Sequence, residues 1–245
     1  MTTPPTTQRR TRMWRPYLKA GRIRIPTYGA MLYVGFTVGV IAAACITHLN
    51  YTRFAAASLC LLVAALIGAR AWYLVGHRDQ QRAATGAGLY GGLMSSFVCS
   101  WPAVRLADLE FWRFWDGAAV VLLTGMVVTR VGCLLTGCCA GRETSAWVGM
   151  WLPDAAGNCV RRFPAQLFEL AWSAAILGVG VMLYSPSHRP GALFVGAAAA
   201  YGLGRVVLER LRADWMPGSR WTRINVAFSL VLATGAPACY VVATL

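Results

Sequence analysis

The chain has 245 residues, 57% of them hydrophobic and only 13% charged, and its mean hydropathy is +0.52. Since a soluble domain carries about 25% charged residues, this composition excludes an ordinary water-soluble domain and favours a protein solvated by lipid. The net charge of +14 then indicates attraction to a membrane and its anionic phospholipid, as a surface or as a substrate, and no nucleic-acid partner is expected.

Residues 1–24 form a polar, basic segment that could be mistaken for the start of a signal peptide. The apolar run that follows is too long for a signal peptide, and no small-residue cleavage pattern precedes the next hydrophobic segments. We therefore expect a retained basic N-terminal tail at residues 1–24. Because no internal repeat or soluble domain is evident, we expect residues 25–245 to form a single transmembrane domain.

Apolar runs of roughly 20 residues, long enough to cross a bilayer, recur along the whole chain. They cover residues 28–48, 54–75, 86–104, 117–135, 164–184, 191–207 and 224–242. Because a helix satisfies its own backbone hydrogen bonds in lipid, these runs predict an all-α, polytopic integral membrane protein with about seven transmembrane helices.

The connections between these runs are short, except for residues 140–163, which are polar and carry Trp147 and Trp151. Tryptophan favours the membrane–water interface, so we expect this segment outside the hydrocarbon, on the same face as the N-terminus. Residues 106–116 alternate charged and aromatic side chains and are expected to lie along the interface.

Five charged residues fall inside the candidate spans or at their ends: Arg70, Arg130, Glu169, Arg205 and Glu209. A charge at membrane depth costs at least a few kcal/mol, so each one needs a reason. One interpretation is structural: Arg205 pairs with Glu209 one helical turn away, and the other arginines reach towards lipid headgroups. The interpretation we favour is convergence on a bound anion, because three arginines lie on different spans.

Three cysteines, Cys133, Cys138 and Cys139, lie close together at the end of the fourth apolar run. Their Cys-x4-Cys-Cys spacing is not a recognised zinc pattern, and no nearby histidine completes a tetrahedral set. The sequence therefore predicts no metal site and indicates no cofactor. A disulfide between Cys133 and Cys138 on an oxidising face is left open.

Six short motifs follow one another along the chain. Residues 25–29 read Ile-Pro-Thr-Tyr-Gly, residues 68–70 Gly-Ala-Arg, and residues 90–93 Tyr-Gly-Gly-Leu. Residues 129–142 carry an arginine among glycines and cysteines, residues 164–169 read Pro-Ala-Gln-Leu-Phe-Glu, and residues 201–212 fit Tyr-Gly-x-x-Arg-x-x-x-Glu-x-x-Arg. Through these motifs, in this order, the chain resembles the prolipoprotein diacylglyceryl transferases.

The resemblance implies an enzyme that moves a diacylglyceryl group from phosphatidylglycerol to the thiol of the lipobox cysteine of a prolipoprotein, releasing glycerol phosphate. It also implies a multi-pass protein of the bacterial plasma (inner) membrane. In such a reaction a thiolate expels a phosphate ester, so the barrier depends on stabilising negative charge on the leaving group.

Arginines suit this chemistry, since a guanidinium is permanently charged and can hold two phosphate oxygens at once. We expect Arg130 and Arg205 to hold the phosphodiester, Glu209 to orient Arg205, and Arg70 to be a third, weaker contact. A base must take the thiol proton, and the matched motifs offer Tyr90 or Tyr28; for Tyr28 a belt position at the interface is an alternative.

The remaining matched positions, Gly141 and Gln166, are expected from the resemblance to contact the substrate. The chain also departs from the family pattern: Tyr90 stands where familiar members carry His, and Cys133 and Cys138 stand where they carry Asn and Glu, although a Gly-Cys-Cys variant is familiar too. A second hypothesis is therefore a non-catalytic lipid-binding or translocating paralogue.

The two available indications of orientation disagree. Most Lys and Arg residues outside the spans lie on the side of the tail and of residues 140–163, which the positive-inside rule places in the cytoplasm. The family resemblance places the same side outside, and we follow the resemblance.

Overall fold

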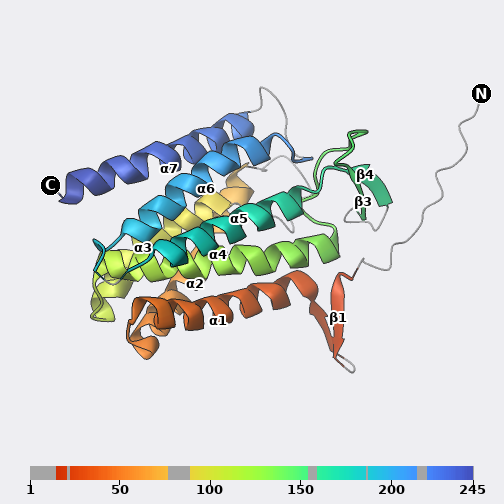
Figure 1. The fold of residues 1–245 in the computed structure, drawn as a ribbon. Helices are drawn as coiled ribbons and strands as arrows, with labels where there is room; N and C mark the ends of the chain where they lie inside the picture. Colours follow the sequence, from red (N-terminus) through yellow and green to blue (C-terminus); the bar gives the residue numbers. More distant parts are fainter. Residues whose placement is uncertain are drawn as a thin grey trace, which may run out of the picture.

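The computed structural model describes residues 15–20, 23–76, 89–153, 159–185, 187–213 and 220–244. Within these ranges seven helices and two short hairpins follow one another (Figure 1). The helices are α1 (Thr27–Thr47), α2 (Tyr51–Gly76), α3 (Leu89–Leu106), α4 (Phe111–Thr136), α5 (Ala165–Leu183), α6 (Ala192–Glu209) and α7 (Arg220–Thr244). The strands are β1 (Tyr17–Ala20), β2 (Ile23–Pro26), β3 (Met150–Pro153) and β4 (Cys159–Arg162). The first 14 residues of the predicted basic tail lie outside the described residues.

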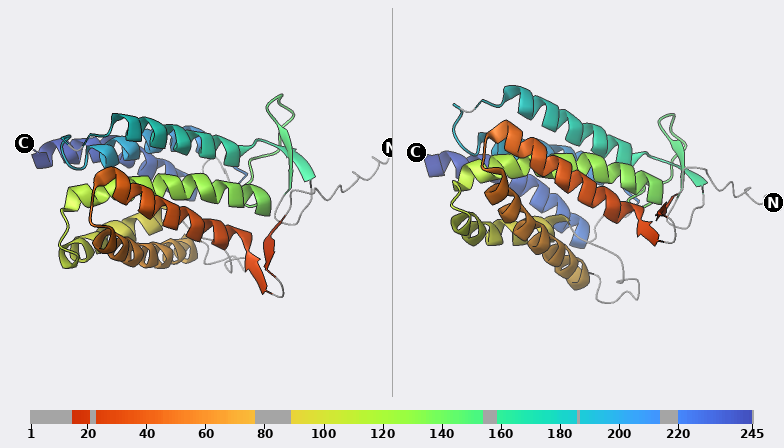
Figure 2. Two further views of the ribbon diagram at one scale, coloured as in Figure 1. Left: turned by 60° about the horizontal axis from the view of Figure 1, so that its bottom comes forward. Right: turned by 90° about the horizontal axis from the view of Figure 1, so that it is seen from below.

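Helix α4 is the axis of the bundle. It packs against α1 on one side and α5 on the other and also contacts α6, whereas α2 packs on α3 and α6 on α7. The views in Figure 2 show the helices running roughly alongside one another, with both hairpins at one end. The ends of α4 and α6 and the starts of α1 and α5 meet at this end (Figure 1), which we call the hairpin end.

Small residues allow α1 and α4 to approach closely. A Cβ atom added at Gly39 would lie 2.9 Å from the Cα atom of Val121, and one at Gly35 would lie 3.0 Å from the Cα atom of Gly125. Lipid offers no hydrophobic drive for helix association, so such backbone contact is how membrane helices gain van der Waals energy. Farther along the same contact, Gly132 faces Met31 and Tyr28, which fixes the start of α1 beside the end of α4.

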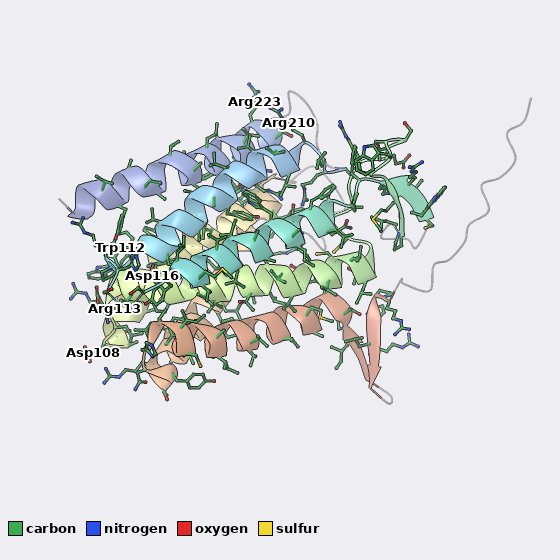
Figure 3. The ribbon with its side chains drawn as sticks, in the orientation of Figure 1. Asp108, Trp112, Arg113, Asp116, Arg210 and Arg223 are labelled. Carbon is green, nitrogen blue, oxygen red and sulfur yellow. The ribbon has the colours of Figure 1, made fainter. Side chains whose placement is uncertain are left out.

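The opposite end of the bundle holds an aromatic core. Phe54, Phe114 and Trp115 are fully or almost fully buried, and the indole nitrogen of Trp115 donates to the Ser100 hydroxyl over 3.2 Å. The carboxylate of Asp116 accepts hydrogen bonds from the backbone nitrogens of Gly191, at 2.7 Å, and Phe194, at 2.9 Å. It thereby satisfies the free N–H groups at the start of α6. Asp108, Trp112, Arg113 and Asp116 mark this end in Figure 3.

The prediction of an all-α polytopic membrane protein is confirmed, and each of the seven apolar runs contains a helix. Five helices within the described residues, α1, α2, α4, α5 and α6, are long and apolar enough to cross a membrane. The sequence prediction was seven spans. Helix α3 is not among these five, and it is more polar because it carries three serines, Ser95, Ser96 and Ser100. Helix α7, with 25 residues, has the length of a span.

Two features differ from the sequence interpretation. Residues 111–116 do not lie along the interface but form the first turns of α4, because Phe114 and Trp115 are buried between helices. In addition, the sequence predicted no strands, whereas β1 pairs with β2 and β3 pairs with β4, the latter within residues 140–163. Both hairpins lie at the same end of the bundle (Figure 1). Outside a helix, short strands can still pair their backbone groups with each other.

Candidate substrate site

Glu169, in the second turn of α5, is the centre of a buried group of charges near the hairpin end. Its side chain is 2% exposed. One carboxylate oxygen contacts Arg130 of α4, and the other contacts Arg205 of α6 and, at 3.6 Å, Arg212 just beyond α6. A second carboxylate, Glu209, lies 2.6 Å from the other terminal nitrogen of Arg205. We call these five residues the arginine cluster.

The arginine cluster carries one more positive than negative charge, since it holds three guanidinium groups and two carboxylates. Buried charges must be paired to be tolerated, and Glu169 and Glu209 supply this pairing within the cluster. The Nε atoms of Arg130 and Arg205 are buried and have no hydrogen-bond partner among the described residues. Each arginine is thus held through its terminal nitrogens while one N–H donor stays unused.

Glu209 is fixed from a second direction. The side-chain nitrogen of Asn225 in α7 donates to its free carboxylate oxygen over 3.3 Å, and α6 and α7 cross closely because Gly202 faces the backbone of Ser229 and Ala233. The expected pairing of Arg205 with Glu209 is therefore present. That Glu209 orients Arg205 for a substrate stays a prediction.

Tyr90, in the first turn of α3, reaches the same region and contacts α7. Its hydroxyl hydrogen bonds with the hydroxyl of Ser229, and its ring stacks on Phe228 with centroids 5.4 Å apart. The hydroxyl also lies close to the Arg205 guanidinium and the Glu209 carboxylate. The structure therefore brings Tyr90 to the arginine cluster, as the shared motifs suggested; its role as a base stays a prediction.

Tyr28 and Arg70 lie less centrally. Tyr28, in the first turn of α1, is 44% exposed, and its hydroxyl is within electrostatic reach of Arg130 and of the cysteines that end α4. Arg70 is half-buried in α2, which packs against α3. Their contribution to a substrate site stays a prediction.

Gln166 and Gly141 hold the surrounding backbone. Gln166 is 1% exposed, and its side-chain nitrogen donates to the carbonyl oxygen of Cys138 over 3.0 Å, leaving the side-chain oxygen buried without a partner in the described part of the chain. Gly141 pairs with Arg212 in an isolated antiparallel bridge and has Phe163 against its Cα. A side chain at Gly141 would collide with the Phe163 carbonyl, so glycine here lets the loop after α4 lie against the segment that leads into α5.

Three cysteines gather beside Arg130, and we call them the thiol cluster: Cys133, Cys138 and Cys139. Their sulfur atoms all lie within 4.8 Å of one another. Arg130 contacts the Cys133 sulfur over 3.8 Å. The pKa of the Cys139 thiol is lowered, because the other two thiols hydrogen bond to its sulfur and the guanidinium groups of Arg130 and Arg212 lie near.

Three residues at this site had no predicted role in it: Glu169, Arg212 and Tyr201. Glu169 stood out as a charge at a span boundary, but nothing in one sequence shows which arginines fold onto it. Arg212 appeared only as the end of a motif. Tyr201 is buried on α6, close to Arg205, Arg130 and Glu169, and its hydroxyl has no partner in the described ranges.

Together, the helical bundle and the arginine cluster define a polytopic membrane protein with a buried group of charged residues near one end. A sequence profile of the family described as prolipoprotein diacylglyceryl transferase matches residues 16–242. The chain therefore belongs to the prolipoprotein diacylglyceryl transferase family.

Similar proteins named phosphatidylglycerol–prolipoprotein diacylglyceryl transferase occur in several bacteria. The relative from Shouchella clausii is 26% identical over 93% of this chain and 89% of its own length. The relative from Acaryochloris marina is 24% identical over 80% of this chain and 78% of its own length. The relative from Thermosynechococcus vestitus is 26% identical over 80% of this chain and 81% of its own length. The similarity thus spans nearly the whole bundle and both hairpins.

Proposed function

We propose that the protein is a phosphatidylglycerol–prolipoprotein diacylglyceryl transferase of the bacterial plasma membrane, with its hairpin end on the outer face. The observation that carries this proposal is the arginine cluster, in which two buried guanidinium groups are fixed by Glu169 and each keeps an unused Nε–H donor. A phosphodiester is an acceptor of charge −1, and the two Nε–H groups are donors that it can use.

The chemistry follows from the position of this charge. The acceptor thiolate attacks the glycerol carbon that carries the phosphate, so that a carbon–sulfur bond forms while the carbon–oxygen bond to phosphate breaks. The bonding electrons leave with glycerol phosphate, and negative charge grows on its oxygen. Arg130 and Arg205 are already held in place by Glu169, so they stabilise that charge without having to reorganise.

Membrane geometry supplies the two substrates from different directions. Phosphatidylglycerol reaches the cluster from the bilayer, and the prolipoprotein presents its lipobox cysteine at the membrane surface, where the exposed Trp147 and Trp151 near hairpin β3–β4 are suited to the interface. The charged site lies at this end of the bundle, so headgroup and thiol can meet there.

The test is release of glycerol phosphate by purified protein in phosphatidylglycerol liposomes on addition of a lipobox peptide. Two controls are matched to it: the same peptide with serine in place of cysteine, and liposomes of phosphatidylcholine. We expect release only with the cysteine peptide and phosphatidylglycerol. Binding of phosphatidylglycerol without any release of glycerol phosphate would instead support the non-catalytic paralogue. The observation that favours this alternative is the hydrogen bond between Tyr90 and Ser229, because it occupies the hydroxyl that was expected to act as a base.

A further inference from the structure

The thiol cluster has the geometry of a metal site. The sulfur atoms of Cys133 and Cys139 are 4.0 Å apart, and the Cys138 sulfur completes a triangle with no distance above 4.8 Å. Zinc–sulfur bonds of 2.3 Å in a tetrahedral arrangement place neighbouring sulfurs about 3.8 Å apart. A disulfide would need two sulfurs at about 2.0 Å and would leave the third unused, whereas one metal ion uses all three.

The chain brings the three sulfurs together through an unusual turn. Helix α4 ends at Gly137, which takes the left-handed conformation with φ of 69°, and Cys139 is also left-handed, with φ of 55°. A non-glycine residue rarely adopts this conformation unless the surrounding structure holds it there. The turn directs the chain back so that Cys139 meets Cys133, and Gln166 holds the intervening carbonyl of Cys138 from α5.

The charge around the thiol cluster narrows the choice of ion. Soft thiolate ligands select zinc or monovalent copper. Three thiolates with Zn²⁺ form a unit of charge −1, whereas with Cu⁺ the unit would carry −2. The smaller charge costs less at a partly buried site. The thiol cluster holds three ligands and no more among the described residues. Three protein ligands with an open fourth position are typical of catalytic rather than structural zinc.

We propose that Cys133, Cys138 and Cys139 bind Zn²⁺ and that the open fourth position takes the thiol of the acceptor cysteine. The second half of this inference rests on the proposed function. The Cys-x4-Cys-Cys spacing predicted no metal site. The spacing alone does not show the turn after α4, which brings the three sulfur atoms together.

An acceptor thiol bound to zinc loses its proton, and this supplies a nucleophile without a histidine base. The zinc-bound sulfur attacks the glycerol carbon of phosphatidylglycerol, and the electron pair of the broken carbon–oxygen bond leaves on glycerol phosphate. The released proton passes to the phosphate or to water, so the products are the thioether and glycerol phosphate. Arg130 belongs to the arginine cluster and also contacts Cys133 of the thiol cluster, which places nucleophile and leaving group side by side.

Zinc binding by the three cysteines is tested by measuring the zinc content of the full chain, purified in detergent without chelators. We expect about one zinc per chain, with loss of zinc in Cys133→Ser, Cys138→Ser and Cys139→Ser. Cys60→Ser is the matched control, since Cys60 is exposed on α2, and it should keep the metal. If a serine variant fails to fold, replacement of zinc by Co²⁺ in the unmodified chain still decides, through sulfur-to-cobalt charge-transfer absorption. Protein that binds neither ion, or that carries a Cys133–Cys139 disulfide instead, overturns the inference.

The catalytic half is tested on the cobalt-loaded protein in phosphatidylglycerol liposomes. A lipobox peptide should change the cobalt absorption by adding a fourth sulfur, and the serine peptide should not. Removing the metal should slow glycerol phosphate release by a factor of about 100 or more, the range of a lost base. Unchanged release from metal-free protein would refute the role of zinc but leave the proposed function intact. A metal-loaded protein that releases nothing would refute the proposed function but leave the metal site.

Discussion

Arg205 of α6 and Glu169 of α5 form a buried ion pair between two neighbouring helices. Because Glu169 also contacts Arg130 of α4 and Arg212 beyond α6, a single carboxylate joins three segments of the chain. Removing one member of a buried ionic group leaves the others uncompensated and typically costs 3–5 kcal/mol. The stability of the hairpin end and the position of its arginines therefore depend on the same residue.

Glu169→Gln should lower stability strongly, because three guanidinium groups would then surround a neutral amide. We expect a loss of about 3–5 kcal/mol, measured as a lower unfolding midpoint in detergent. Glu143→Gln is the control: this carboxylate pairs with Arg162 but is 64% exposed, and such pairs are worth about 1 kcal/mol or less. Equal effects of the two variants would show that the arginine cluster is not the buried network described here.

Arg130→Lys should be nearly as damaging as Arg130→Ala in the release of glycerol phosphate. Lysine keeps the charge but has one compact ammonium group, so it cannot contact Glu169, the Cys133 sulfur and a phosphate oxygen from a rigid planar fork. The matched control is Arg113→Lys, an exposed arginine at the opposite end that pairs with Glu110. Near-normal turnover in Arg130→Lys would mean that charge alone is required.

Gly202→Ala and Gly196→Ala test the packing that places Arg205 and Glu209, since both lie on α6. A Cβ atom at Gly202 would lie 2.5 Å from the carbonyl oxygen of Ser229, whereas nothing lies within 4 Å of one at Gly196. We expect Gly202→Ala to separate α6 from α7 and lower both the unfolding midpoint and activity. Gly196→Ala should be neutral or stabilising by up to about 1 kcal/mol. A stable, active Gly202→Ala variant would contradict this contact.

The two ends of the bundle should face opposite sides of the membrane. Trp147 is 90% exposed near hairpin β3–β4, and Leu106 is 89% exposed at the last residue of α3. With the hairpin end outside, an impermeant thiol reagent should label Trp147→Cys in intact cells and Leu106→Cys only after lysis. The reverse pattern would place the site in the cytoplasm, as the distribution of basic residues suggests. Labelling of both from one side would refute the bundle topology.

The sequence predicted the positions of the helices well and the contacts between them poorly. Apolar runs predicted α1 and α5 to within a residue or two, since lipid exposure selects long apolar stretches. The start of α4 was misplaced because buried aromatics such as Phe114 look the same as interfacial ones in a sequence. Glu169 and the thiol cluster were not recognised as centres of contact, because their partners come from different segments and only the folded chain brings them together.

The ion pair between Arg205 and Glu209 serves either catalysis or stability alone, and variants of the two residues distinguish these roles. Arg205 has two carboxylate partners, Glu169 and Glu209. If Arg205 stabilises the departing phosphate, Arg205→Ala should reduce glycerol phosphate release by a factor of about 100 to 1,000, as for loss of one transition-state donor. Glu209→Gln should cost less, since Glu169 still holds the arginine. The double variant should be no slower than Arg205→Ala, because residues that act as a unit are not additive.

A purely structural pair gives a different pattern in the same three variants. Each single change would then strand a buried charge and lower the unfolding midpoint, and the double variant would recover part of the loss. Glu169 sharpens the distinction, because without Arg205 it keeps Arg130 and Arg212 as partners. If Arg205 acts in catalysis, the loss of activity in Arg205→Ala should therefore persist at temperatures well below the unfolding midpoint of that variant. Recovery of stability in the double variant, combined with no lipid-dependent release by the unmodified protein, would rule out the transferase.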